Sequence, residues 1–242
     1  LGRGVVAERD GATMWSVMWL PYGPDAASVG MVIVDPAHQG EGIGRALMTA
    51  ALGDLDGRAV MVNASADGLK LYRALGFQPI DEIQQHQGAA FAVPVAPLGP
   101  GERIRPIGRG DGADLAALDR AATGLKRDRL VAALLDEAEG VVLDRDGEAI
   151  GFALYRRFGQ GHLIGPVIAP TQEGAKALIS HWVASNPGMF IRVDVLGDSL
   201  LSPWLDELGL AGVGPVTTMV RGTKPHRAET SRYWAVASQA FG

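Results

Sequence analysis

Residues 29–52 read VGMVIVDPAHQGEGIGRALMTAAL, and this stretch decides the fold. Its first part, residues 29–34, is an apolar run rich in β-branched side chains, which predicts a buried strand. Asp35 and Pro36 end that strand, because proline has no N–H to give to a ladder. A glycine turn follows and runs into a helical pattern. Its predicted apolar face consists of Ile43, Ala46, Leu47, Ala50 and Ala51.

A glycine turn between a strand and a helix predicts an anion site. The first N–H groups of a helix lack partners, and the helix dipole adds partial positive charge. Two common phosphate motifs are absent. The dinucleotide pattern G-x-G-x-x-G fails because Arg45 stands sixth from Gly40 and Leu47 sixth from Gly42, and no Gly-Lys-Ser/Thr completes a P-loop.

The turn itself reads QGEGIG over residues 39–44. It resembles the Q/R-x-x-G-x-G/A pyrophosphate loop of the GNAT superfamily of N-acetyltransferases, which bind acetyl-coenzyme A. The resemblance implies that main-chain N–H groups of residues 39–45 hold the pyrophosphate. It also implies that the pantetheine lies between strands at 29–34 and 58–63. The implied coenzyme contacts are Ile33, Val34, Gln39, Gly40, Gly42, Ile43, Gly44 and Arg45. The alternative is a glycine-rich turn without a ligand.

A second matching motif is LYRALGF at residues 71–77. In GNAT enzymes an L-Y-x-x-x-G-F segment places a tyrosine near the coenzyme sulfur, which implies that Tyr72 is the general acid. Departure of the thiolate, whose conjugate acid has a pKa of about 8.5, benefits from such a donor. The alternative is a half-buried core tyrosine. The family usually has asparagine seven residues earlier, but here Ser65 takes that place and Asn63 precedes it, so Ser65 is only a candidate contact.

Length and composition narrow the class of protein. The chain has 242 residues, 47% hydrophobic and 20% charged, which suits two globular domains of ordinary size. We predict no membrane span and no nucleic-acid partner, since the net charge is −5 and no basic cluster stands out. The absence of cysteine excludes disulfides and fits a cytoplasmic protein. The five histidines have no ligand spacing, so no metal site is predicted.

The chain repeats itself, which predicts two copies of one α/β unit with a mixed sheet. Hairpin turns on Asp10-Gly11 and on Asp146-Gly147 correspond, and LYRALGF corresponds to WLDELGL at 204–210. The Pro- and Gly-rich segment 96–101 predicts a linker. We therefore predict tandem GNAT-like domains at 1–95 and 102–242. The first copy lacks an opening strand and two helices, either because its front is cut off or disordered or because the domain is reduced.

The second copy has lost the ligand motifs. Its turn reads TQEGAK at 171–176, and Leu205 stands where Tyr72 does. We predict that only the first copy binds acetyl-coenzyme A, while the second helps to form the acceptor pocket or a homodimer face. Residues 197–200 (GDSL) spell an esterase block, but no Asp-x-x-His follows. The repeat explains them as a turn with Asp198 or Ser199 as N-cap.

The predicted activity is acetyl transfer from acetyl-coenzyme A to a primary amine of a small molecule or peptide. The general base is open between Glu8 and Asp25, and exposed turn carboxylates are the simpler explanation for both. The alternative function is a non-catalytic acyl-coenzyme A sensor.

Overall fold

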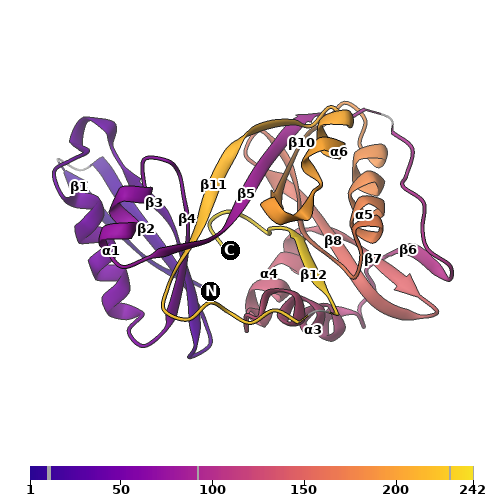
Figure 1. Cartoon of the computed structure of the whole chain (residues 1–242), viewed down its shortest axis with the longest axis horizontal. Coiled ribbons are helices and arrows are strands. Elements are labelled where there is room, and N and C mark those ends of the chain that lie inside the picture. Colours follow the sequence, from indigo (N-terminus) through magenta and orange to yellow (C-terminus); the bar gives the residue numbers. More distant parts are fainter. Residues whose placement is uncertain (10–11, 92, 229, 242) are drawn as a thin grey trace. The chain divides into compact units, whose positions relative to one another are not determined.

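The computed structural model describes residues 1–9, 12–91, 93–228 and 230–241. The chain forms two compact units, each of mixed α/β architecture (Figure 1). Unit 1 comprises Leu1–Asp81, Val216–Pro225 and Gln239–Gly242, and unit 2 comprises Glu82–Pro215 and His226–Ser238. The units therefore differ from the contiguous halves 1–95 and 102–242, because segments of the chain cross between them.

Unit 1 contains a sheet in the order β1-β2-β3-β4-β11. Its elements are β1 (Arg3–Arg9), β2 (Ala12–Tyr22), β3 (Ala26–Val34), the 3₁₀ turn η1 (Pro36–His38), α1 (Ile43–Asp54), β4 (Ala59–Ala64), α2 (Leu69–Ala74) and, from Val216 onward, β11 (Ala211–Arg221). Strands β3 and β4 are parallel and are joined by α1, while the other pairs are antiparallel. This is the crossover that a strand, glycine turn and helix require.

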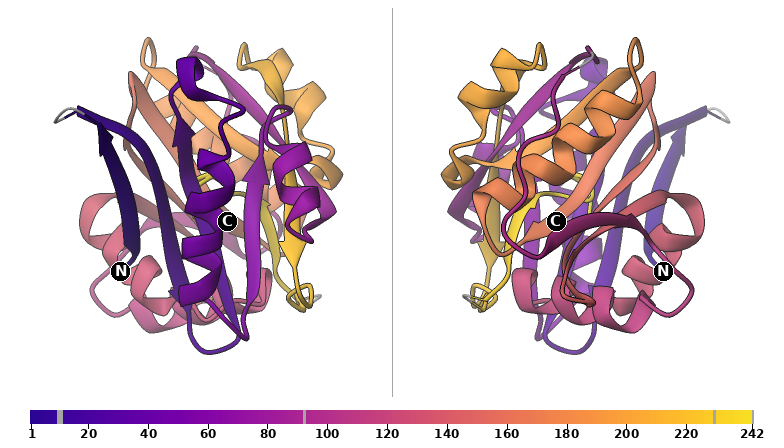
Figure 2. Two further views of the ribbon diagram at one scale, coloured as in Figure 1. Left: turned by 90° about the vertical axis from the view of Figure 1, so that its left-hand side faces the viewer. Right: turned by 90° about the vertical axis from the view of Figure 1, so that its right-hand side faces the viewer.

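Helix α1 covers one face of this sheet (Figure 2, left). Leu47, Met48 and Ala51 are its buried residues, and they pack with Val29 and Val62 in one core cluster. The predicted apolar face of α1 was partly wrong, because Ala46 and Ala50 are exposed. Alanine is small enough to occupy either face, so periodicity alone assigned these two positions poorly.

Strands are exchanged between the two sequence copies. β5 (Gln78–Ala89) belongs to the first copy in the sequence but pairs with β10 of unit 2, from Phe190↔Ala89 to Leu196↔Ile83. β11 belongs to the second copy in the sequence but pairs with β4 of unit 1, from Thr217↔Ala64 to Arg221↔Val60. Each sheet is therefore completed by a strand from the other half of the sequence.

Unit 2 contains a sheet in the order β5-β10-β12-β9-β8-β7-β6. Its further elements are β6 (Glu102–Pro106), α3 (Gly112–Thr123), α4 (Asp128–Glu137), β7 (Glu139–Arg145), β8 (Glu148–Phe158), β9 (Gly161–Ala169), α5 (Gln172–Ser185), β10 (Phe190–Leu196), η2 (Gly197–Ser199), α6 (Ser202–Glu207) and β12 (Arg232–Ala235). Val141 and Leu143 join the core cluster beneath α5, while Val142 between them is equally buried. Alternate residues of β7 are thus buried on both faces of the sheet.

The repeated motif LYRALGF/WLDELGL forms the same helix end in both copies. Phe77 N–H donates to the carbonyl of Tyr72 at 3.0 Å, and Leu210 N–H donates to that of Leu205 at 3.0 Å. Gly76 and Gly209 have φ of 84° and 79°. Both ends are Schellman motifs, in which glycine accepts the left-handed conformation. Glycine therefore ends the corresponding helix in both copies.

Three features of the structure differ from what the sequence indicates. The apolar residues at 89–95 indicate a strand, but β5 ends at Ala89, and Pro94 in that stretch has no N–H to give to a ladder. β12 was not predicted as a strand. Ser199 is buried and accepts from Leu201 N–H at 3.3 Å, but the N-cap of α6 is Leu201, so the predicted cap at Asp198 or Ser199 was wrong. The predicted turn at Asp10-Gly11 lies outside the described residues.

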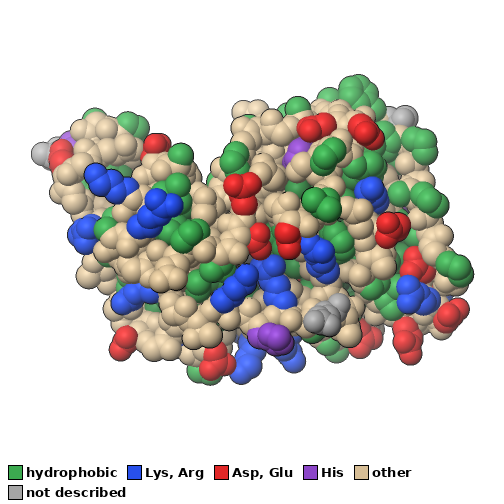
Figure 3. Space-filling view, in the orientation of Figure 1, with side chains coloured by type: hydrophobic (Ala, Val, Ile, Leu, Met, Phe, Trp, Pro, Cys, Tyr) green, Lys and Arg blue, Asp and Glu red, His purple; other side chains and the backbone are tan. Residues whose placement is uncertain are grey.

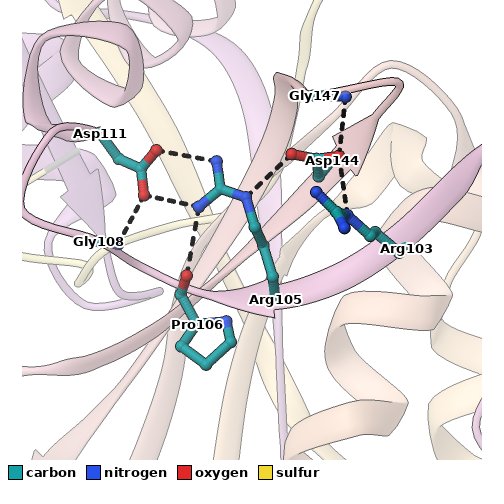
Figure 4. Close-up of polar contacts among 7 residues, drawn as sticks. All are labelled: Arg103, Arg105, Pro106, Gly108, Asp111, Asp144 and Gly147. Carbon is teal, nitrogen blue, oxygen red and sulfur yellow. Dashed lines mark hydrogen bonds and ion pairs between the residues drawn. The ribbon is translucent and has the colours of Figure 1, made fainter.

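A charged network joins β6, α3 and β7 within unit 2 (Figure 4). The Arg105 guanidinium donates to both carboxylate oxygens of Asp111, at 2.7 and 2.9 Å, and to Asp144 at 2.9 Å. Hydrogen bonds from Arg105 hold the pKa of both carboxyl groups below their usual range. The network fixes the hairpin β7–β8 to the start of α3. Within the described residues, no helix is both long and apolar enough to cross a membrane.

Candidate active site

The turn before α1 has an open, glycine-dependent backbone. Gly40 and Gly42 have φ of 89° and 86°, a region that favours glycine, and a Cβ built at either position would meet no atom within 4 Å. The space at Gly44 is narrower, because a Cβ there would lie 3.2 Å from Leu71 Cδ2. The first two glycines therefore leave empty space above the turn, and the third lets α1 approach α2.

The N-terminus of α1 carries unpaired donors. Its first intrahelical bond runs from Ala46 N–H to the carbonyl of Gly42 at 3.0 Å, and the N-cap Gly42 has no side chain to cap the helix. The N–H groups of residues 43–45 consequently have no partner within the helix. Arg45 and Lys70 are exposed beside this turn. In Figure 3, Lys and Arg side chains lie on the visible face of the left-hand part, where α1 lies in Figure 1. The helix end and these cations favour an anion.

Strands β3 and β4 separate next to this turn. They pair from Ala26↔Ala59 to Val29↔Val62 and no further. Beyond that point β3 contains a bulge against β2, where the register shifts between Ser16 and Met18 and Met31 has φ of 53°. Ser16 Oγ donates to the carbonyl of Met31 at 2.9 Å and holds the bulge. Alternate N–H groups of β3 then point away from β2 into the gap that β4 has left.

Tyr72 lies on α2 beside this gap. Its side chain is 6% exposed, packs edge-on against Phe77 at 5.8 Å, and has no hydrogen bond to any residue in the described ranges. Burial raises the pKa of the Tyr72 phenol to about 12, so the group keeps its proton at neutral pH. Gly68 makes room for the ring, since a Cβ at Gly68 would lie 2.8 Å from Tyr72 Cε2.

A cavity of about 620 Å³ brings these segments together. Its lining contains Tyr72 and every coenzyme contact that the sequence implied: Ile33, Val34, Gln39, Gly40, Gly42, Ile43, Gly44, Arg45 and Ser65. Two stretches of the chain, residues 32–45 and 65–74, thus meet at one hollow. The predicted residues are brought together, with the exception of the base candidates.

The base candidates lie elsewhere. Glu8 is exposed on the edge strand β1, which β2 separates from β3, and Asp25 is exposed in the turn before β3. Neither lines the cavity. Sequence reasoning missed Asp67 and Lys70, which do line it. Lys70 stands two residues before Tyr72, so its position on the same short helix was the available signal.

The corresponding gap in unit 2 is filled by the chain itself. β9 and β10 pair in parallel from Ile191↔His162 to Val193↔Ile164, and β12 then lies between them. β12 pairs with β9 at Tyr233↔Ile168 and with β10 at Val195↔Ala235. Protein main chain therefore occupies the opening that stays free between β3 and β4.

The helix after that gap is also closed. Thr171 Oγ accepts from Gly174 N–H at 3.1 Å, and Gln172 Nε2 donates to the carbonyl of Ser199 at 2.9 Å. A side chain thus caps α5, whereas α1 has none. Unit 2 therefore keeps the strand–turn–helix arrangement of unit 1, but the gap between its parallel strands is filled and its helix N-terminus is capped.

Comparisons with known proteins agree with this architecture. The acetyltransferase (GNAT) domain family matches residues 4–93, and a second acetyltransferase (GNAT) family matches residues 115–235. The chain belongs to the GNAT acetyltransferases. It contains two GNAT domains in tandem.

Individual relatives are similar over much of the chain. A Bacillus subtilis protein, the uncharacterised N-acetyltransferase YitH, is 30% identical over 183 residues, which cover 72% of this chain and 64% of that protein. This chain thus spans less than two thirds of that relative. A putative acetyltransferase from Pyrococcus horikoshii has a TM-score of 0.78 at 17% identity, over 99% of this chain and 80% of its own. A tandem GNAT protein from the clavulanic acid biosynthesis pathway has a TM-score of 0.62 at 14% identity, over 92% and 84%. Each of these two solved structures has the same fold as this chain.

Proposed function

We propose that this tandem GNAT protein transfers acetyl from acetyl-coenzyme A to a primary amine of a small molecule or peptide, and that the reaction takes place in unit 1. The observation that carries the proposal is that the glycine turn, the β3–β4 gap and Tyr72 line one and the same cavity. The transfer forms a C–N bond and breaks the C–S bond of the thioester. The amine gives up a proton and the sulfur receives one.

The open turn fits the pyrophosphate of the coenzyme. The N–H groups at 43–45 and the absent Cβ atoms of Gly40 and Gly42 would let phosphate oxygens reach the main chain. Arg45 and Lys70 would add charge-assisted contacts, which are roughly twice as strong as neutral ones. The free N–H groups along β3, near Ile33 and Val34, would bind the pantetheine and polarise the acetyl carbonyl.

Tyr72 would stabilise the departing sulfur as a hydrogen-bond donor. A phenol with a pKa of about 12 is a weaker acid than a thiol with a pKa of about 8.5, so full proton transfer from Tyr72 to the thiolate is unfavourable. The hydroxyl therefore acts by donating to the developing negative charge, and the proton that finally reaches sulfur can come from solvent. Its burial keeps this donor protonated throughout the neutral range.

Only one coenzyme would bind per chain. β12 in the β9–β10 gap and Thr171 on the end of α5 support a second unit that takes no coenzyme. The second copy would then contribute strand β11, which completes the sheet of unit 1.

Calorimetry with coenzyme A and a thiol-release assay with a panel of primary amines test the proposal. We expect one coenzyme per chain and amine-dependent release of thiol. The Gly42→Ala variant should bind coenzyme A at least about tenfold more weakly. Binding without turnover of any amine would instead favour an acyl-coenzyme A sensor, and no binding would refute the assignment.

A further inference from the structure

The C-terminal segment at residues 239–241 is attached to the sheet of unit 1 by side chains. Asn63 Nδ2 donates to the carbonyl of Gln239 at 2.7 Å, and the Tyr22 hydroxyl donates to that of Phe241 at 2.5 Å. Ser28 Oγ donates to the carbonyl of Ala240 at 3.5 Å. Side chains from β2, β3 and β4 thus hold three consecutive carbonyl groups, so the path of this segment is specified.

The segment crosses the sheet where β3 and β4 separate. A Cβ at Gly30 would lie 2.8 Å from both the Cα and the carbonyl oxygen of Ala240. Gly30 directly precedes the bulge residue Met31, and Asn63 directly follows Val62, the last β4 residue paired with β3. Glycine at position 30 is therefore what lets the main chain of Ala240 lie against the mouth of the gap.

The segment lies on the face of the sheet opposite to the helices. Ala27 and Val29 join the core cluster with α1, and successive strand residues point to opposite faces. Ser28 and Gly30 consequently point away from α1, toward the segment. Tyr72 packs in the same cluster as α1. Residues 239–241 and Tyr72 are thus on opposite sides of the gap.

We propose that the main chain of residues 239–241 is a wall of the acceptor site, held in place by Tyr22, Ser28 and Asn63 as positioning residues. The inference rests on the proposed function, which puts the thioester in this gap with its sulfur near Tyr72. An amine adds to the carbonyl carbon through one of the two faces of the planar thioester. Because α1 and Tyr72 lie on one side of the gap, the amine must come from the other side, which the segment borders. The wall therefore limits the size of amine that reaches the thioester.

Releasing the segment tests this inference. The variant Tyr22→Phe/Asn63→Ala removes the hydrogen bonds that these two side chains donate to Phe241 and Gln239. In Gly30→Val, the added side chain clashes with the main chain of Ala240. Tyr155→Phe in unit 2 is the matched control, since that buried hydroxyl has no hydrogen-bond partner in the described part of the chain. Hydrogen exchange of the C-terminal peptide reports release without requiring activity. KM values for n-butylamine, for tetra-alanine and for acetyl-coenzyme A report the effect on the reaction.

In both release variants we expect faster exchange over residues 239–241 and a KM for n-butylamine raised about fivefold, the equivalent of about 1 kcal/mol of lost positioning. Activity toward tetra-alanine relative to n-butylamine should increase, and the KM for acetyl-coenzyme A should stay within about twofold. Unchanged acceptor KM and size preference despite faster exchange would overturn the inference alone, as would unchanged exchange in both variants. A wild-type protein that acetylates no amine would overturn the proposed function, and this inference with it.

Discussion

The glycine turn before α1 gives the sharpest prediction, because the chain contains its own control. Gly42 and Gly57 have similar backbone conformations, with φ of 86° and 77°, and a Cβ at either would meet no atom within 4 Å. Only Gly42 lines the cavity. Substitution by alanine therefore imposes the same kind of backbone strain at both positions but places a methyl group in the cavity at one.

The expected magnitudes separate stability from binding. A left-handed non-glycine residue costs about 1–2 kcal/mol, partly offset by about 0.4–1 kcal/mol because alanine restricts the unfolded chain. Gly42→Ala and Gly57→Ala should both lower the free energy of unfolding by about 1 kcal/mol. In Gly42→Ala, the displaced phosphate should also lose charged hydrogen bonds, each worth about 1.5–3 kcal/mol.

Urea unfolding and calorimetry with coenzyme A measure these two effects separately. Gly42→Ala should bind coenzyme A at least about tenfold more weakly than wild type, equivalent to a loss of about 1.4 kcal/mol, while Gly57→Ala should bind it normally. If Gly42→Ala keeps wild-type affinity while losing as much stability as Gly57→Ala, the turn does not hold the phosphate and the reasoning fails.

Three other predictions concern catalysis and stability. Tyr72→Phe should lower kcat on the order of 10²-fold and leave coenzyme A affinity unchanged by calorimetry; an unchanged kcat would remove the donor role. Asp119→Asn should lower the free energy of unfolding, measured with urea, by about 3–5 kcal/mol, because Asp119 and Arg127 form an ion pair in which each side chain is 1% exposed. A loss below about 1 kcal/mol would contradict this. Arg105 lowers the pKa of Asp144 in the folded protein. The stabilisation that ionised Asp144 contributes is therefore present above its unfolded pKa of about 3.9 and is lost as the pH falls through its folded pKa. Arg105→Gln should flatten the dependence of the free energy of unfolding on pH below about pH 4, and an unaltered slope would refute the coupling.

Local features were predictable from the sequence because few neighbours decide them. The left-handed turn at Gly42 and the helix end at Gly76 follow from the conformational freedom of glycine within a few residues. Tyr72 was found because its spacing from Gly76 and Phe77 matches a known motif. The coenzyme candidates lie on either side of one short turn, so a correct local fold is sufficient to bring most of them together.

Features that depend on pairing distant segments were not predictable in this way. β12 has only four residues, and no periodicity in them indicates that they fill the β9–β10 gap. Nothing in the sequence around Gly30 indicates that Ala240, 210 residues later, lies against it. The exchange of β5 and β11 likewise leaves no trace in either strand, because the alternation of side chains is the same whichever unit a strand joins.

The sequence by itself determined a strand, an open glycine turn, a capped helix and a repeated α/β unit. It also determined that only the first copy keeps the turn motif and the tyrosine. The tertiary structure decided which strand completes each sheet, and that β12 closes the second gap. It also decided that residues 239–241 border the first gap. Local conformation is set by steric limits within a few residues, whereas strand partners are chosen by the burial and hydrogen bonding available once distant segments have met.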